Sequence, residues 1–209
     1  ILKQLGDYLQ AAYYFVKTQA AYGYIINLKN EPTPRHIVTN AERHQHAKYL
    51  LNIDLKDFFH QISYSDVSCI LTQPPFRFSE ELAHQLACLT TFNGRLPMGS
   101  PTSPVLSNFG AKQMDVDLIQ FAVANRFTFT RYVDDMSFSS LNEPITLHHL
   151  DTITTLIRSH KFELNEQKIK WFGPDDEKLV TGLRLGVNIT IPDAFFEMLD
   201  NDLIRLKSV

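Results

Sequence analysis

The sequence predicts an α+β fold of the split βαβ type, in which helices pack on one face of an antiparallel sheet. Residues 48–54 form an apolar run with the length of a buried strand. Residues 126–140 contain two strand-forming segments around a tight turn, which is typical of a β-hairpin. Helical patterns lie between them, and another follows at about 146–160. The order strand, helices, hairpin, helix and strand is the connectivity of this fold.

The part before the hairpin is predicted to be mainly helical. Apolar residues recur at helical spacing over 2–20, and a short helix is expected to start near Asn40, a good N-cap residue. Another short helix is expected at 57–62, and Ser79 opens one that runs to about Phe92. Ser100 offers a capping hydroxyl before Pro101, so the next helix is expected from there to about Asn125.

The part after the hairpin is predicted to contain short strands and a last helix. The strands are expected at 161–164, 168–173, 178–181 and 183–191, and the helix from Asp193 to Val209.

The composition is that of a globular protein without a membrane span. The 209 residues suffice for one domain, or a domain plus part of another, and 44% are hydrophobic. No apolar stretch reaches the roughly eighteen residues that a span needs. Cys69 and Cys88 have no metal-type spacing, which favours reduced thiols and a cytoplasmic location.

The charge balance argues weakly against nucleic acid as a partner, because the net charge is −3 and the pI about 6.2. Aspartates that bind a cation would count in that total without repelling a substrate. Basic residues that would bind nucleic acid strongly are therefore expected outside this chain. The chain begins at Ile1 and stops inside a predicted helix, so we expect it to be a fragment.

Three aspartates provide the main chemical signal. Asp54 ends the apolar strand, and Asp134 and Asp135 lie in the predicted hairpin. Three carboxylates brought together by two strands can hold two Mg²⁺ ions about 3.5–4 Å apart, the arrangement used for in-line phosphoryl transfer. The alternative is a hairpin whose Asp-Asp turn tolerates positive φ and has no further role.

Three segments together resemble the palm of a reverse transcriptase. They are Asn-Ile-Asp-Leu-Lys-Asp-Phe-Phe at 52–59, Leu-Pro-Met-Gly-Ser-Pro-Thr-Ser-Pro at 96–104, and Tyr-Val-Asp-Asp at 132–135. The resemblance implies a polymerase palm at 49–191 with a helical insertion on the fingers side at about 63–95. It also implies partial fingers at 1–48 and the start of a thumb at 192–209.

The resemblance assigns roles to individual residues. It implies that the catalytic residues are Asp54, Asp134, Asp135 and Lys168, and that the carbonyl of Leu55 joins the three aspartates in binding two Mg²⁺ ions. Lys168 would contact the triphosphate or protonate departing pyrophosphate; a solvated surface lysine is the alternative. The implied nucleotide-binding residues are Asp57, Phe58, Phe59, Met98, Gly99 and Lys168. The implied primer and template contacts are Pro97, Ser100, Tyr132 and Val133.

Two of the implied nucleotide-binding positions, Phe59 and Met98, bear on the choice of nucleotide. A ring at Phe59 would clash with a 2′-hydroxyl and so favour deoxynucleoside triphosphates, whereas core packing is the better interpretation for Phe58. The family usually has Gln where this chain has Met98, which indicates a modified nucleotide pocket.

Two smaller elements resemble those of retron reverse transcriptases. They are Asn-Ala-Glu-Arg-His at 40–44 and Val-Thr-Gly at 180–182. The resemblance implies that Asn40, His44, Val180, Thr181 and Gly182 recognise a cognate RNA. A helix cap with a surface histidine is the alternative for the first element, and an ordinary strand end is the alternative for the second.

The resulting hypothesis is a retron-type RNA-directed DNA polymerase. The resemblance implies a structured non-coding RNA as template and primer, a branched RNA–DNA hybrid product, and a role in phage defence with an effector protein. The alternatives are a group II intron maturase, an abortive-infection reverse transcriptase, and a non-catalytic RNA-binding module that kept the palm as a scaffold. An RNA-dependent RNA polymerase is disfavoured by Phe59.

Overall fold

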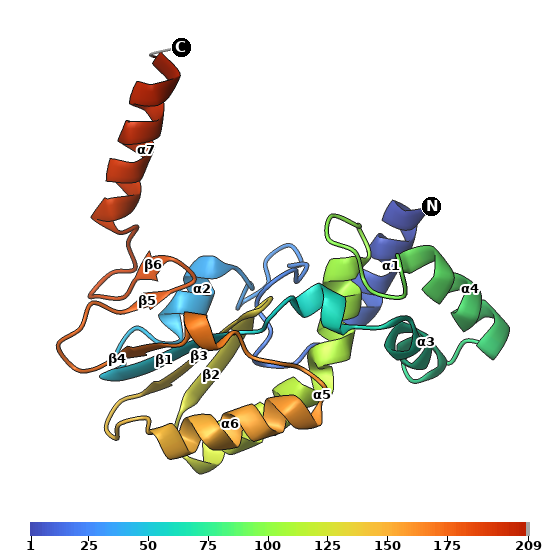
Figure 1. The fold of residues 1–209 in the computed structure, drawn as a ribbon, viewed down its shortest axis with the longest axis horizontal. Coiled ribbons are helices and arrows are strands. Elements are labelled where there is room, and N and C mark those ends of the chain that lie inside the picture. The colour runs from blue at the N-terminus through green and yellow to red at the C-terminus, as the bar shows by residue number, and fades with distance from the viewer. Residues whose placement is uncertain (208–209) are drawn as a thin grey trace.

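A four-stranded antiparallel sheet in the order β2-β3-β1-β4 forms the centre of the computed structural model, which describes residues 1–207 (Figure 1). Its strands are β1 (Tyr49–Asp54), β2 (Thr128–Tyr132), β3 (Asp135–Ser140) and β4 (Lys170–Phe172). The hairpin β2–β3 lies beside β1, and β4 completes the sheet on the other side of β1. The predicted α+β class is confirmed.

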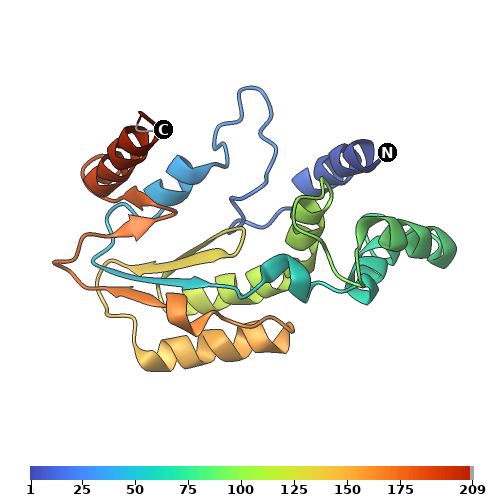
Figure 2. The same ribbon diagram turned by 45° about the horizontal axis from the view of Figure 1, so that its top comes forward.

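One face of the sheet carries the main core. Side chains alternate along a strand, so Leu51 and Ile53 of β1 share this face with Met136 and Phe138 of β3, and all four are buried. Helices α5 (Ser103–Ala124) and α6 (Leu147–Ser159) cover it, as both views show (Figures 1 and 2). This is the predicted arrangement of helices on one face.

The opposite face is covered only at one end. Helix α2 (Ile37–Glu42) and the hairpin of β5 (Leu179–Val180) and β6 (Leu183–Arg184) pack there around a second, smaller cluster. Its buried members are Ala41, Leu50, Val180 and Leu183. The other end of this face, where β1 finishes and β3 begins, remains open.

The remaining elements surround this framework. Helix α1 (Leu2–Tyr14) packs on α5, and η1 (Phe58–Gln61) follows β1. Helices α3 (Tyr64–Thr72) and α4 (Glu80–Thr90) pack on each other beside α5, and the short η2 (Glu166–Lys168) precedes β4. Helix α7 (Asp193–Lys207) projects away from the body (Figure 1). None of the helices in the described part of the chain is long and apolar enough to cross a bilayer.

Two predicted helix starts were wrong. Helix α2 is capped by His36, whose ring accepts from the backbone of Thr39 while the Thr39 hydroxyl accepts from His36, so Asn40 lies inside the helix. Helix α5 starts at Ser103, because the second Ser-Pro pair, with Pro104 in the first turn, begins it. Ser100 instead bonds the Thr102 hydroxyl in the preceding loop.

Other boundaries also differ from the prediction. Helix α1 ends at Tyr14 rather than residue 20, since the next residues run beside β2. Residues 161–164 form only one bridge, from Leu164 to Leu55, and the strand expected at 183–191 shortens to β6. Helix α3 was expected only as part of a helical insertion. The last two residues of the predicted C-terminal helix lie outside the described residues.

Candidate active site at the open end of the sheet

Asp54 and Asp135 face each other at the open end of the sheet. Asp54 is the last residue of β1 and pairs with Asp135, the first residue of β3. Their neighbours Ile53 and Met136 point into the core, so both carboxylates emerge on the open face. Asp54 is only 5% exposed, whereas Asp135 is exposed. Strand register alone therefore brings together two carboxylates from distant parts of the chain.

Asp134 lies in the turn of the hairpin rather than in a strand. The turn consists of Val133 and Asp134, one residue earlier than the Asp134-Asp135 turn predicted from the sequence. Val133 has φ 64°, which costs a β-branched residue about 1–3 kcal/mol. The carbonyl of Asp134 accepts from the backbone N–H of Leu55 at 3.0 Å. This bond ties the turn to the residue that follows Asp54.

Withdrawal from water and the neighbouring carboxylates disfavour the ionised forms of Asp134 and Asp135. Withdrawal from water, followed by the charges of Asp134 and Asp54, raises the pKa of Asp135 to about 6. Withdrawal from water and the charge of Asp54 also raise the pKa of Asp134. Lys168 partly offsets this charge, because its ammonium bonds Asp54 at 2.9 Å. That bond raises the pKa of Lys168, so it remains a cation.

This donor set fits a hard divalent cation in its chemistry. Carboxylate oxygens are the ligands that Mg²⁺ prefers, and a cation would relieve the repulsion that, after withdrawal from water, raises the pKa of Asp134 and Asp135. Within residues 1–207, however, no three acidic, histidine or cysteine side chains are already gathered at metal-binding geometry. The ligands would thus have to close around the ion.

A cavity of about 250 Å³ lies on one side of the Asp54–Lys168 pair. Phe59 is half-buried at its wall, whereas Phe58 is 3% exposed and packs on Phe162 at 5.6 Å between ring centroids, so Phe58 is a core residue. The wall also includes Leu55, Asp57, Met98, Val133, Asp134 and Asn165. Five predicted nucleotide-binding residues (Asp57, Phe58, Phe59, Met98 and Lys168) are therefore brought to one cavity.

The loop before α5 lies at the edge of this cavity. Met98 is 72% exposed, and Gly99 has φ 81° with open space around its α-carbon. The carbonyl of Pro97 accepts from the Ser103 hydroxyl at 2.6 Å, which fixes the loop to the start of α5.

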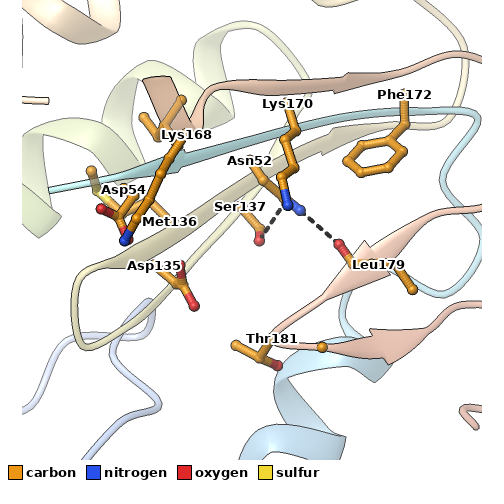
Figure 3. Close-up of a pocket in the computed structure, with 12 residues that line it drawn as sticks. Asn52, Asp54, Asp135, Met136, Ser137, Lys168, Lys170, Phe172, Leu179 and Thr181 are labelled. Atoms are coloured by element: carbon orange, nitrogen blue, oxygen red, sulfur yellow. Dashed lines mark hydrogen bonds and ion pairs between the residues drawn. The ribbon is translucent and has the colours of Figure 1, made fainter. Parts of the chain in front are cut away.

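A second cavity, of about 200 Å³, lies on the other side of the pair (Figure 3). Asn52 forms its floor: its amide nitrogen donates to the Leu179 carbonyl at 2.6 Å, and its amide oxygen accepts from the Ser137 hydroxyl at 3.0 Å. Thr181 borders the same cavity with a buried hydroxyl that has no hydrogen-bond partner among the described residues. The sequence analysis assigned no role to Asn52 or Ser137. Both are polar residues that alternate with apolar residues along a strand, and this alternation could have placed them on the open face.

The two retron-like elements are far apart in the sequence but pack on each other in the fold. Asn40 and His44 are each 1% exposed, and the His44 ring bonds the hydroxyls of Ser139 at 2.7 Å and Thr130 at 2.8 Å. Burial lowers the pKa of His44 to about 3, so its ring is neutral. Val180 is buried with α2. The His44 bonds and the packing of Val180 with Ala41 and Leu50 hold α2 and β5 on the sheet.

Only the turn of the second element reaches the site. Thr181 and Gly182 connect β5 to β6 with φ 48° and 79°, and positive φ at both positions is the requirement of a type I′ turn. Both residues border the cavity of Asn52.

Comparisons with known proteins show similarity in sequence and in fold. Residues 11–185 match the family described as "Reverse transcriptase (RNA-dependent DNA polymerase)". The chain is 29% identical to the retron Ec86 reverse transcriptase of Escherichia coli, covering 70% of this chain and 45% of that protein. It is 28% identical to the retron Mx162 reverse transcriptase of Myxococcus xanthus, covering 89% and 42%. The chain thus spans about half the length of the curated relatives it matches.

Solved structures share the fold at low sequence identity. Apo telomerase from Candida tropicalis, truncated from its C-terminal domain, superposes with a TM-score of 0.60 at 12% identity over 91% of this chain and 45% of that chain. Telomerase from Candida albicans in complex with a TWJ fragment of telomeric RNA gives 0.61 at 12% identity, over 91% and 38%.

Proposed function

We propose, from the premise that this chain belongs to the reverse transcriptase family, that the protein carrying it is an RNA-directed DNA polymerase. The observation that carries this proposal is the meeting of Asp54, Asp134 and Asp135 between two cavities that both border Lys168. Residues 49–191 would form the palm with the insertion at about 63–95, residues 1–48 part of the fingers, and residues 192–209 the start of the thumb.

The aspartates would serve as ligands in this reaction. Two Mg²⁺ ions held by Asp54, Asp134, Asp135 and the Leu55 carbonyl would activate the primer hydroxyl and neutralise the charge on the leaving pyrophosphate. Lys168 adds a fixed positive charge beside Asp54. The strand pairing of Asp54 with Asp135 and the Leu55–Asp134 hydrogen bond keep these residues adjacent before any ion arrives.

The two cavities suit two substrates on opposite sides of the aspartates. The cavity of Phe59 would take the incoming deoxynucleoside triphosphate, with Asp57 and Met98 in its wall and Gly99 next along the loop. The cavity of Asn52 would take the end of the primer, whose hydroxyl must approach the same carboxylates. Further contacts to primer and template are proposed for Pro97, Ser100, Tyr132 and Val133.

Phe59→Val is expected to raise the incorporation of ribonucleotides relative to deoxynucleotides by about ten- to a hundredfold. Removing the ring would remove the steric block to a 2′-hydroxyl, and this changes kcat/KM for one competitor far more than for the other. Single-nucleotide incorporation measured with both triphosphates checks it. Phe58→Val is the matched comparison, because Phe58 is in the core and its loss should lower stability without changing the ratio. An unchanged ratio for a folded Phe59→Val protein would remove Phe59 from sugar selection.

The finer function we propose is that of a retron enzyme in the cytoplasm. It would start from a 2′-hydroxyl of its own structured RNA, copy part of that RNA into a branched RNA–DNA product, and act with an effector protein in phage defence. This is supported by the names of the curated relatives and by the packing of the two retron-like elements against each other. Within these elements, Thr181 and Gly182 are proposed to contact RNA. The buried residues Asn40, His44 and Val180 would instead support the RNA-binding surface from the protein interior.

Sequencing the nucleic acid that copurifies with the complete protein tests this function. The expected result is one short structured RNA joined to DNA complementary to part of it. Intron RNA would favour a maturase, and DNA unrelated to the bound RNA would favour an abortive-infection enzyme. RNA without any DNA, from cells supplied with the protein's own locus, would favour the non-catalytic module.

A further inference from the structure

A buried ion pair lies directly beneath the hairpin that carries Asp134 and Asp135. Arg131 of β2 and Asp115 of α5 have side chains that are both 0% exposed. The Arg131 guanidinium holds the carboxylate with two bonds, Nε to Oδ1 at 2.6 Å and Nη2 to Oδ2 at 2.8 Å. Although burial alone would lower the pKa of Arg131, the charge and hydrogen bonds of Asp115 raise it, so the guanidinium stays a cation. Arg131 lies on the core face of the sheet, because it pairs with the buried Met136.

The same guanidinium reaches the turn. Its Nη1 donates to the carbonyl of Val133 at 2.9 Å, and its Nη2 also donates to the Asn108 side chain at 3.1 Å. Val133 is the turn residue with φ 64°, a conformation that its branched side chain disfavours. A conformation of this kind persists only where surrounding contacts determine it. The bond from Arg131 is a contact of this kind.

The segment that follows α1, residues 18–23, packs against the turn from another side. The backbone of Arg131 bonds Ala20 at 2.7 Å and Tyr22 at 2.8 Å, and Asn108 donates to the Gly23 carbonyl at 3.0 Å. A β-carbon at Gly23 would lie 2.6 Å from the side chain of Val133 and 2.7 Å from its backbone nitrogen. Only glycine allows this approach. The Thr18 hydroxyl also donates to Asp115 at 2.9 Å, so this segment and α5 hold the turn together.

Stability alone does not account for such a pair. Replacing a buried ion pair by apolar residues of similar volume is often neutral or stabilising, because both ions lose their hydration. What apolar side chains could not supply is the directed hydrogen bond to the Val133 carbonyl.

We propose that Arg131, fixed by Asp115, is a positioning residue for catalysis: it holds the strained turn so that Asp134 and Asp135 stay in place for the reaction. Arg131 touches neither substrate nor the reacting atoms, and acts through Val133. The inference rests on the proposed polymerase function. A displacement of about 1 Å at a reacting centre can cost about a hundredfold in rate.

The test compares two variants of the complete protein with the wild type. Arg131→Lys keeps the charge opposite Asp115, but one ammonium cannot span both that carboxylate and the Val133 carbonyl. The double variant Arg131→Met with Asp115→Leu removes both charges, so neither is left unpaired. Rapid-quench incorporation of one nucleotide gives the burst rate and the burst amplitude. Melting temperature and primer–template Kd are measured in parallel.

For both variants the expected result is a burst rate lowered by about thirty- to a hundredfold. Amplitude, which counts active molecules, and primer–template Kd should stay within twofold of the wild type. Asp117→Asn is the matched control: it removes the carboxylate charge that faces His160 at 2.7 Å, on the helix of Asp115 but away from the turn, and should lower the melting temperature without changing the rate. A lower amplitude at an unchanged rate in Arg131→Lys would make the pair purely structural and overturn the proposal.

A burst rate within threefold of the wild type in folded Arg131→Lys would also overturn the proposal, even if the double variant does not fold. That result would leave the polymerase function intact. Failure of the wild type itself to incorporate any nucleotide would instead contradict the proposed function, and with it this inference.

Discussion

Asp135→Asn is expected to lower the rate of RNA-templated DNA synthesis by at least about a thousandfold, and Asp134→Asn to do the same. Each substitution removes one negative oxygen from the set that would bind the divalent cations, and with it the positioning and charge neutralisation of the transition state. RNA affinity should change by less than about threefold, because it depends mainly on phosphate contacts elsewhere. Primer extension and filter binding on the same preparations measure the two effects.

Thermal stability separates this loss of function from misfolding. The pKa of Asp135 is raised to about 6 in the folded protein, so folding disfavours its ionised form. Stability should therefore fall as the pH rises from about 4 to above 6, and Asp135→Asn should abolish this part of the pH dependence. In metal-free buffer at pH 7.5 the variant should melt slightly above the wild type, and below pH 4 the two should coincide. The expected gain is small, since the side chain is exposed.

Asp151→Asn on the exposed surface of α6 makes the same chemical change away from the site. It should leave both synthesis and the pH dependence of melting unchanged. If Asp135→Asn or Asp134→Asn extends a primer in Mg²⁺ like the wild type, the substituted aspartate has no part in the mechanism.

Residues whose positions follow from strand alternation could be placed from the sequence. Asp54 ends an apolar strand and Asp135 begins the strand that pairs with it, so register alone sets them side by side. The position of the turn was missed by one residue, because Asp-Asp resembles a turn pair whereas the turn is Val133-Asp134. A β-branched residue in the left-handed region is held there by tertiary contacts, which no local pattern contains.

Buried polar residues could not be placed in this way. Arg131 is in phase with the apolar Phe129 and Val133, but an arginine in a strand is normally expected at the surface. Its burial depends on Asp115, one helix away, which becomes its partner only in the folded chain. His44 likewise looked like a surface residue until α2 brought its ring between two hydroxyls of the sheet. In both cases the partner lies on a different element, beyond the reach of periodicity.

Lys168→Met is expected to lower the nucleotide incorporation rate by about a hundredfold or more. Lys168 borders both cavities, and its ammonium lies 2.9 Å from Asp54, where charge on the transferred phosphate would develop. The bond to Asp54 raises the pKa of Lys168 above its ordinary value, so the side chain should remain protonated at every pH used for the assay. A permanently charged group favours an electrostatic role over proton transfer to pyrophosphate.

Lys168→Arg distinguishes these two roles. Arginine keeps the charge but does not give up a proton in proteins. If the charge matters, this variant should retain a rate within about tenfold of the wild type, with the same pH–rate profile. If Lys168 protonates the leaving pyrophosphate, the arginine variant should be as slow as Lys168→Met, and a pH-dependent step present in the wild type should vanish. Lys161→Met, on the 81% exposed side chain of a nearby lysine, controls for a general loss of positive charge and should leave the rate unchanged. A wild-type rate for Lys168→Met would show that Lys168 is a solvated surface lysine and that the charge of the leaving group is neutralised without it.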